Sequence, residues 1–293
     1  MSNNQKLPIV LAHGIARFDI LLEILREKTT APETRLGDQF QYFKGIKTVL
    51  EDDGFTVFHP NQEFAGPVDT RAEQLKARIN EAISITGVDR VHIIAHSMGG
   101  LDARHMIVDK GMSEKVASLT TIGTPHLGTI LADSLLGAGG KFLQHLVKPL
   151  LNIDGFTDLT ITACEQFNAR AEDQEARNKV VYQTYASFEA LNRVFALLVP
   201  SWLFIQHHID PNDRNDGLVP VSSQKWKKEL VASDGTPKPV AQNDFPFPAD
   251  HLNEVGWWDL QEAVLGSGSL SKQAEDYEKK IKDLYLGIAR GLQ

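Results

Sequence analysis

The chain contains one cysteine among its 293 residues, Cys164, so no disulfide can form within it. None of its apolar runs is long enough to span a bilayer. Residues 1–6 lack the apolar core of a secretory signal peptide. Together these absences predict a cytoplasmic protein with no transmembrane segment, while export without a cleaved N-terminal signal stays open as an alternative.

Positive charge is also scarce, because 30 Lys and Arg face 38 Asp and Glu and the formal net charge is −8. An acidic balance of this kind disfavours nucleic acid and anionic membrane surfaces as partners. The hydrophobic content of 42% is sufficient for a sizeable core. The length suits a single α/β domain over residues 1–293 that carries a cap.

Strand-like and helix-like segments alternate along the chain. Apolar runs predict strands, and amphipathic runs between them predict helices. The predicted strands are 8–12, 55–58, 91–94, 116–122 and 180–185, and the predicted helices are 47–52, 70–85 and 101–110. This alternation predicts a mostly parallel central sheet flanked by helices. A short Gly/Ser stretch at 266–269 precedes a C-terminal segment, 270–293, in which a helix is predicted over 273–289.

A serine occupies a predicted tight turn between a strand and a helix. Ser97 lies in Ala95-His96-Ser97-Met98-Gly99-Gly100, after the buried run 91–94 and before the helix 101–110. A strand–serine–helix turn is typical of a nucleophile elbow, where only small neighbours fit. Ala95 and Gly99 supply those small neighbours on either side. The segment therefore predicts Ser97 as a nucleophile.

A serine hydroxyl needs a base to remove its proton and an acid to orient that base. In the elbow architecture the acid and the histidine follow the serine in that order. Of the ten histidines, only His251 lies near the C-terminus after a plausible acid. We favour Asp216, in the turn Asn215-Asp216-Gly217, as that acid. Its rivals, each predicted to be a solvated loop carboxylate, are Asp210, Asp213 and Asp250.

Backbone N–H groups are needed to stabilise the oxyanion that forms when a serine attacks an acyl carbonyl. One such donor comes from the residue after the nucleophile, here Met98. The second comes from the loop after an early strand, and the strand 8–12 leads directly into His13-Gly14-Ile15. We therefore predict Ile15 and Met98 as the oxyanion hole. This chemistry requires no cofactor.

Five segments together resemble the bacterial true lipases of the Pseudomonas, Burkholderia and Proteus group, which belong to the α/β-hydrolase superfamily. These segments are Leu11-Ala12-His13-Gly14-Ile15, Ala95 to Gly100, Ile122-Gly123-Thr124-Pro125-His126-Leu127-Gly128, Asn215 to Pro220, and Asp250-His251-Leu252-Asn253. The resemblance spans about residues 7–258. It implies an α/β-hydrolase fold, a Ser-Asp-His triad, and a helical lid or cap inserted at 127–159. The alanine at position 95 resembles the Bacillus lipases instead.

The chain departs from those lipases where they bind a structural calcium ion. The family pattern places an Asp two residues after the catalytic histidine, and this chain has Asn253 there. A neutral amide is a poorer calcium ligand than a carboxylate, and residues 194–202 offer no carboxylate either. We therefore expect no calcium site of that kind. His207 and His208, near Asp210 and Asp213, are expected to lie in a polar loop rather than to bind a metal ion.

The lid segment decides which kind of hydrolase this chain is. Four apolar side chains recur there at helical spacing, and we predict them to contact substrate: Phe142, Leu143, Leu146 and Val147. Glycines at 137–140 would act as a hinge, and Pro149 would end or kink the helix. A lid that opens at a lipid–water interface and a permanently packed cap helix share this periodicity. We favour the lid, because it follows the Gly-Thr-Pro-His segment at the ligand-binding edge of the sheet.

These features predict a serine hydrolase that cleaves carboxylic esters through an acyl-enzyme, and the resemblance implies triacylglycerols as substrates. The alternatives are an esterase of short soluble esters, a thioesterase or phospholipase, and a non-catalytic α/β-hydrolase that binds lipid. The histidines that flank the motifs, His13, His96 and His126, are expected to orient backbone by hydrogen bonding. Cys164 and the pair Trp257-Trp258 are expected to pack in the core.

Overall fold

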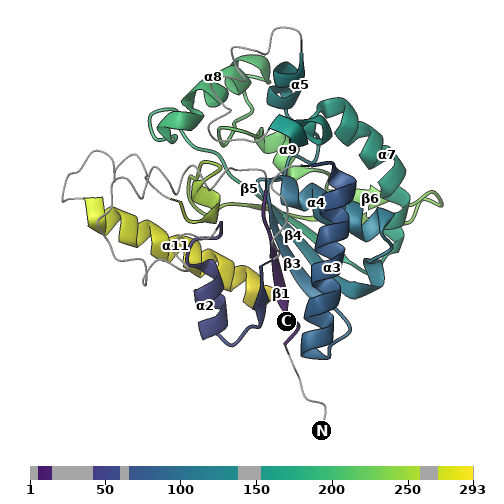
Figure 1. Ribbon diagram of the computed structural model, residues 1–293. Helices are drawn as coiled ribbons and strands as arrows, with labels where there is room; N and C mark the ends of the chain where they lie inside the picture. Colours follow the sequence, from purple (N-terminus) through teal and green to yellow (C-terminus); the bar gives the residue numbers. More distant parts are fainter. Residues whose placement is uncertain (1–5, 15–41, 60–65, 138–152, 258–269, 293) are drawn as a thin grey trace.

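A computed structural model describes residues 6–14, 42–59, 66–137, 153–257 and 270–292 (Figure 1). Ile15 and the four predicted lid side chains, Phe142, Leu143, Leu146 and Val147, lie outside the described residues. Of the predicted lid or cap at 127–159, the structure describes α5 (Ile130–Leu136) and the short 3-10 helix η3 (Ile153–Leu159).

Six strands form one sheet in the order β2-β1-β3-β4-β5-β8, and every neighbouring pair is parallel. The predicted mostly parallel sheet flanked by helices is confirmed. The strands are β1 (Ile9–Ala12), β2 (Val57–Phe58), β3 (Val91–His96), β4 (Val116–Ile122), β5 (Val181–Ala186) and β8 (Ala241–Asp244). A separate antiparallel pair consists of β6 (Glu229–Val231) and β7 (Pro237–Pro239).

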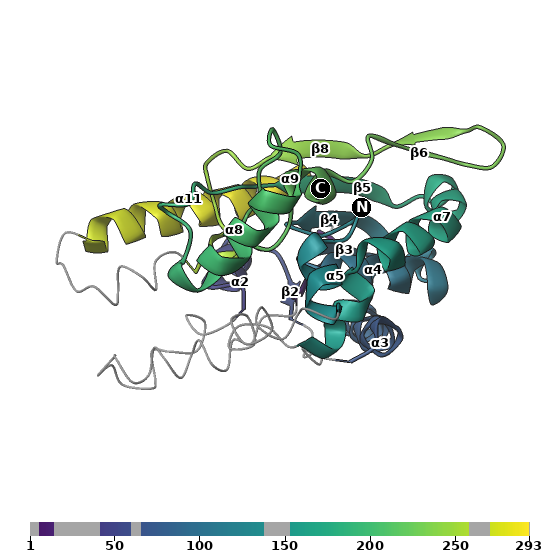
Figure 2. The same cartoon turned by 90° about the horizontal axis from the view of Figure 1, so that it is seen from above.

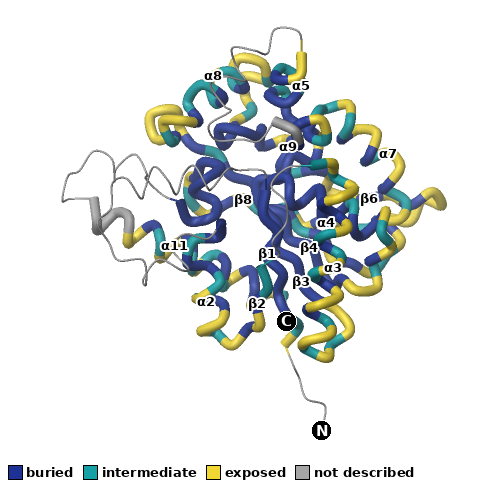
Figure 3. Tube along the Cα trace, viewed as in Figure 1, coloured by how far each residue is buried: buried dark blue, intermediate teal, exposed yellow. Residues whose placement is uncertain are grey.

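Burial explains why the central strands lack an alternating pattern. Every residue of β1, β3 and β4 is buried (Figure 3), as expected for a parallel sheet with helices on both faces. On one face, α2 (Ile46–Asp52) and α11 (Leu270–Gly291) pack through Leu50, Ile281 and Tyr285.

The other face is covered by α3 (Val68–Thr86), α4 (Met98–Asp109) and α7 (Ile161–Arg177). Figure 2 shows these helices on the opposite side of the sheet from α2 and α11. The two helical layers bury two separate apolar clusters. Because all six strands run parallel, their carboxyl ends meet at one edge of the sheet, where loops can gather functional groups.

The predicted polar loop around His207 and His208 is wrong, because both residues end the helix α8 (Val199–His208). Pro200 stands in its first turn, where a missing N–H costs nothing, and Ile205 is buried. The Nδ1 atom of His208 lies 2.7 Å from the carbonyl oxygen of Phe204, one helical turn earlier. Among the described residues, no helix has the length and apolar character needed to cross a membrane.

Candidate active site

Ser97 sits in a strained turn between β3 and α4. Its φ of 56° and ψ of −134° lie outside the regions that L-residues normally adopt, and such backbone strain costs about 1–3 kcal/mol. The following helix approaches β1 so closely that a Cβ on Gly99 would lie 2.7 Å from the carbonyl oxygen of Ala12. The glycine is therefore needed to let the helix pack, while the turn projects the Ser97 hydroxyl from the edge of the sheet.

The structure brings Ser97, His251 and Asp216 into one hydrogen-bonded row. Nε2 of His251 lies 2.8 Å from Oγ of Ser97, and Nδ1 lies 2.8 Å from Oδ2 of Asp216. A carboxylate can only accept, so Nδ1 carries the imidazole proton and Nε2 accepts from the serine hydroxyl. The exposed fractions are 5%, 2% and 0%, respectively, so water competes little with these bonds.

Asp216 is held by neutral donors. The backbone N–H groups of Leu218 and Val219 donate to Oδ1 at 2.8 and 2.7 Å. The side-chain amide of Gln224 donates to Oδ2 at 3.0 Å. The backbone carbonyl oxygen of Asp216 accepts a hydrogen bond from the backbone N–H of His251 at 2.9 Å. These bonds stabilise a buried negative charge and fix its position relative to the imidazole.

The side chain of Asp250 is fully buried. The sequence-based prediction of a solvated loop carboxylate at this position is therefore wrong. Oδ1 accepts from the backbone N–H groups of Leu252 and Asn253 at 3.0 and 2.9 Å, and Oδ2 accepts from that of Phe195 at 2.8 Å. Burial raises the pKa of Asp250 to about 7. This residue anchors the loop that carries His251, and the polar-looking sequence around it did not reveal that role.

The amino end of α4 and the end of β1 meet beside the nucleophile. Met98 is the first residue of α4, where unpaired N–H groups and the helix dipole favour negative charge. A Cβ on Gly14 would lie 2.6 Å from Cβ of Ser97 and 2.8 Å from the hydroxyl oxygen of Tyr42. A glycine is therefore required where β1 passes the serine.

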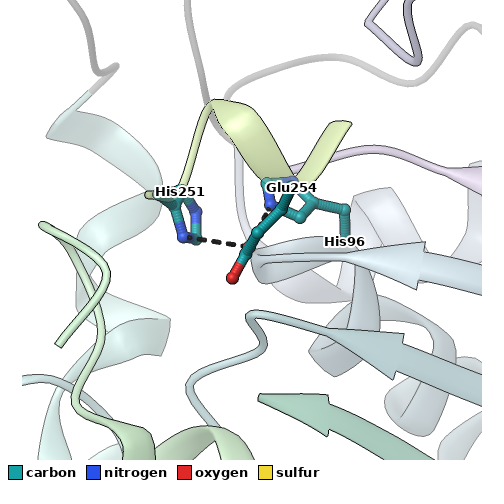
Figure 4. A group of neighbouring side chains, drawn as sticks. All are labelled: His96, His251 and Glu254. Atoms are coloured by element: carbon teal, nitrogen blue, oxygen red, sulfur yellow. Dashed lines mark hydrogen bonds and ion pairs between the residues drawn. The ribbon is translucent and has the colours of Figure 1, made fainter. Parts of the chain in front are cut away.

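Sequence reasoning missed a second row of buried polar groups behind the first. Oε2 of Glu254 lies 2.8 Å from Nε2 of His96 and 3.6 Å from Nδ1 of His251 (Figure 4). Nδ1 of His96 lies 2.7 Å from the hydroxyl of Tyr42. The hydroxyl of Ser187 contacts Oε1 of Glu254. The only sequence signal was an acid three residues after His251.

The predicted backbone role of the flanking histidines holds for His13 and His96. Nδ1 of His13 lies 3.1 Å from the carbonyl oxygen of Gly14. The ring of His96 bonds to the backbone of His251 as well as to the side chains described above. The ring of His126 bonds to side chains instead, with Thr121 Oγ1 at 2.9 Å and Arg104 at 3.3 Å.

Burial fixes the protonation of these rings. It lowers the pKa of both His96 and His126 well below the usual range, and the guanidinium of Arg104 lowers that of His126 further. Cys164 and Trp257 are buried, as predicted for core residues. Burial also raises the pKa of the Cys164 thiol to about 12, which makes it unreactive. Trp258 lies outside the described residues.

Among the described residues, one group of side chains has atoms of the type that ligate metal ions close together: His96, His251 and Glu254, within 4.8 Å of one another. Each of those atoms already takes part in a hydrogen bond or ion pair to another side chain. Binding of a cation would require breaking the bond between His251 and Asp216. We therefore interpret the group as a hydrogen-bonded network.

An apolar pocket opens next to Ser97. It lies between the loop after β4, the helices α5 and η3, and the turn that carries Asp216. Its other lining residues are Pro125, Thr129, Leu131, Phe156, Leu159, Leu218 and Val219. Six of the eight lining side chains are therefore apolar, and the other two, Ser97 and Thr129, carry hydroxyls. Such a surface suits a hydrocarbon chain attached to a reacting carbonyl.

Comparison with known proteins agrees with the fold. The family model described as alpha/beta hydrolase fold matches residues 8–191. Triacylglycerol lipase 2 of Saccharomyces cerevisiae is 28% identical over 282 residues, covering 86% of this chain and 81% of that protein. A triacylglycerol lipase of Vibrio cholerae serotype O1 is 33% identical over 279 residues, covering 85% of this chain and 79% of that protein. Lipase 1 from Pelosinus fermentans shares the fold, with a TM-score of 0.60 at 18% identity over 97% of this chain and 99% of that chain.

Proposed function

The chain belongs to the α/β-hydrolase family and is a carboxylic-ester hydrolase of the lipase type, and we propose that it cleaves acylglycerol esters through Ser97, His251 and Asp216. The observation that carries the assignment of residues is the hydrogen-bonded row from the serine hydroxyl to the buried carboxylate, with both links at 2.8 Å. Nucleophile, base and orienting acid are in bonding distance without any rearrangement.

The reaction follows from this geometry. His251 takes the proton of Ser97 as its oxygen attacks the ester carbonyl, and the resulting imidazolium is stabilised by Asp216. The same imidazolium then protonates the departing alcohol, which leaves an acyl-serine. Water, activated by His251 in the same way, releases the fatty acid and restores the serine.

The oxyanion of the tetrahedral intermediate is assigned to two backbone donors. The N–H of Met98 lies at the start of α4 and is the first of them. Ile15 follows the glycine that passes Ser97 and is the second. Ile15 is outside the described residues, so its role rests on the sequence alone.

Acylglycerols are the substrate class that best fits the pocket and the relatives. The pocket beside Ser97 is lined mostly by aliphatic and aromatic side chains, and two relatives that match most of this chain are named triacylglycerol lipases. The motifs favour the Pseudomonas, Burkholderia and Proteus group within the family. We further propose that the insertion predicted over 127–159 acts as a lid, with Phe142, Leu143, Leu146 and Val147 contacting substrate.

Initial rates on p-nitrophenyl esters from acetate to palmitate, together with a triolein emulsion, test this proposal in wild type and Ser97→Ala. We expect wild type to cleave long-chain esters and the emulsion, and the variant to lose at least about 10⁴-fold in kcat. Cleavage of short soluble esters alone would replace the lipase by an esterase. Hydrolysis retained by Ser97→Ala would overturn the triad, and inactivity of wild type on all these esters would overturn the ester substrate.

A further inference from the structure

Ser187 has one hydroxyl proton but contacts two acceptor oxygens. Its Oγ lies 2.8 Å from the carbonyl oxygen of Ala249 and also contacts Oε1 of Glu254. A hydroxyl can donate to only one of them. When Ser187 donates to Ala249, its contact with Glu254 is a hydrogen bond only if Oε1 carries a proton. The arrangement is therefore fully satisfied when Glu254 is a neutral carboxylic acid.

The rest of the row agrees with this proton position. His96 Nε2–H then donates to Oε2 of Glu254 at 2.8 Å, and the hydroxyl of Tyr42 donates to Nδ1 of His96 at 2.7 Å. The backbone of Gly14 bonds in turn to the Tyr42 oxygen. Each group from Ala249 to Gly14 then has a partner of the right kind. The row runs from the loop that carries His251 to the strand end beside Ser97.

The two carboxyl groups near His251 have different donors. Asp216 receives two backbone N–H groups, an amide N–H and the imidazole N–H. The side-chain partners of the Glu254 carboxyl are Ser187 and His96, and no backbone N–H among the described residues donates to it. Two buried carboxyl groups that both face one imidazole do not both ionise without a cation. The better-supported Asp216 therefore carries the charge.

The surroundings of Glu254 contain no lysine or arginine among the described residues that face it. The titratable groups around it are His96 from β3, His251 and Asp250 from its own loop, Asp216 from the turn before α9 (Val221–Lys225), Tyr42 before α2, and Tyr277 and Tyr285 from α11. Burial raises the pKa of Glu254 well above its usual range, and the charges of Asp216 and Asp250 act in the same direction, against the smaller lowering by the contact with Ser187.

We propose that Glu254 is a positioning residue that works as a neutral acid, fixing His96 and, through it, Tyr42 and Gly14, while Asp216 alone presents a negative charge to His251. The proposal rests on the catalytic roles given to Ser97, His251 and Asp216 above. The ring of His96 packs against that of His251, with centroids 4.5 Å apart, so holding His96 also limits the movement of the base. A second full charge 3.6 Å from Nδ1 would instead make the imidazole hold its proton too tightly to act as a base at neutral pH.

Glu254→Gln and Glu254→Leu form a matched pair of variants. The glutamine amide can donate to Ser187 and accept from His96, so it reproduces the neutral acid. Leucine has a similar volume but leaves both partners unsatisfied. We expect Glu254→Gln to keep kcat/KM within about threefold of wild type, and Glu254→Leu to lose about tenfold or more in kcat with KM little changed.

The decisive readout is the pH at which kcat/KM falls on the acid side, where His251 becomes protonated. Glu254→Gln should leave this pH unchanged within about 0.3, because no charge is removed. If Glu254 were ionised in wild type, the substitution would move the acid limb down by about 1 pH unit or more. That shift, or a wild-type kcat in Glu254→Leu, would overturn the proposal.

Two further variants separate this inference from the proposed function. Asp216→Asn removes the charge that we assign to the site and should displace or abolish the acid limb. Ser97→Ala should be inactive throughout. Activity in Ser97→Ala would overturn the triad itself, whereas an inactive Ser97→Ala together with a shifted acid limb in Glu254→Gln would overturn only the role of Glu254.

Discussion

The buried carboxylates of Asp216 and Glu175 differ in the kind of group that neutralises them. Glu175, on α7, is held by the two-pronged guanidinium of Arg104 on α4, with both contacts at 2.8 Å. That guanidinium also stacks over the ring of Trp226 at 3.8 Å. Asp216 instead faces neutral N–H donors and the ring of His251.

The difference separates a charge that stabilises the fold from one that takes part in the reaction. Arg104 holds Glu175 through two parallel charge-assisted hydrogen bonds, so this pair fixes α4 against α7. The partners of Asp216 carry no charge until His251 accepts a proton. Its negative charge is therefore only partly compensated at rest and gains its cation during the reaction. The sharpest tests remove one partner from each pair.

Asp216→Asn should give the largest effect. The asparagine no longer selects the tautomer with the proton on Nδ1, so Nε2 is not free to accept from Ser97, and kcat should fall by about 10³–10⁴-fold. Far-ultraviolet circular dichroism should remain that of wild type. A loss of less than tenfold in ester hydrolysis would show that another acid orients His251.

Glu175→Gln should have a smaller effect, and on stability rather than on chemistry. It leaves the guanidinium of Arg104 buried without a counter-charge, which costs about 3–5 kcal/mol in the free energy of unfolding. Urea unfolding measures this loss, and kcat per folded molecule should stay within a few fold. Glu172→Gln, on the same helix, is the matched control, because its partner Lys227 is 44% exposed, and such pairs contribute about 1 kcal/mol or less. Equal losses in both variants would contradict the comparison.

The smallest effect is a pH dependence of stability. Burial, aided by Arg104, lowers the pKa of His126 well below its usual range, so the unfolded chain binds a proton there that the native state does not. The stability this ring contributes is present above about pH 6.5 and is lost as pH falls, by up to roughly 1.4 kcal/mol per pH unit.

His126→Gln should remove that part of the slope, measured as melting temperature between pH 7.5 and 5. Asp250 contributes to the pH dependence of stability with the opposite sign, because burial raises its pKa to about 7. This contribution is the same in wild type and in His126→Gln. His208→Gln, at the exposed end of α8, serves as the control with an unchanged slope. An identical slope in His126→Gln and wild type would show that the folded and unfolded states bind protons equally at His126.

The parts of the fold with a local cause were predictable. The strand β1 is a continuous apolar run, and β3 and β4 show no alternation of apolar and charged residues, because both faces of these strands are buried. Ser97 was recognisable because its turn demands small neighbours. The edge strand β8, Ala-Gln-Asn-Asp, carries no such signal, because its residues are exposed or half-buried. Helix α8 was also missed, since its apolar residues surround it on nearly every side.

The second row of the site could not be predicted in the same way. Tyr42, His96, Ser187 and Glu254 come from four distant segments, and no spacing rule links them. The prediction for Asp250 was wrong for a related reason. Its flanking prolines are typical of a surface loop, whereas its carboxylate oxygens accept hydrogen bonds from buried backbone N–H groups. Buried polar networks are determined by which groups remain unpaired after the fold has formed.

The contact between Gly123 and Glu254 constrains how this sequence can change over evolutionary time. Gly123 adopts a φ of 57°, and a Cβ there would overlap the Oε2 atom of Glu254. A lineage that gains a side chain at position 123 before position 254 has lost its acid must pass through a clashing intermediate. The reverse order passes only through a weakened network. We therefore expect Glu254 to be replaced before Gly123, although the two positions are far apart in the sequence.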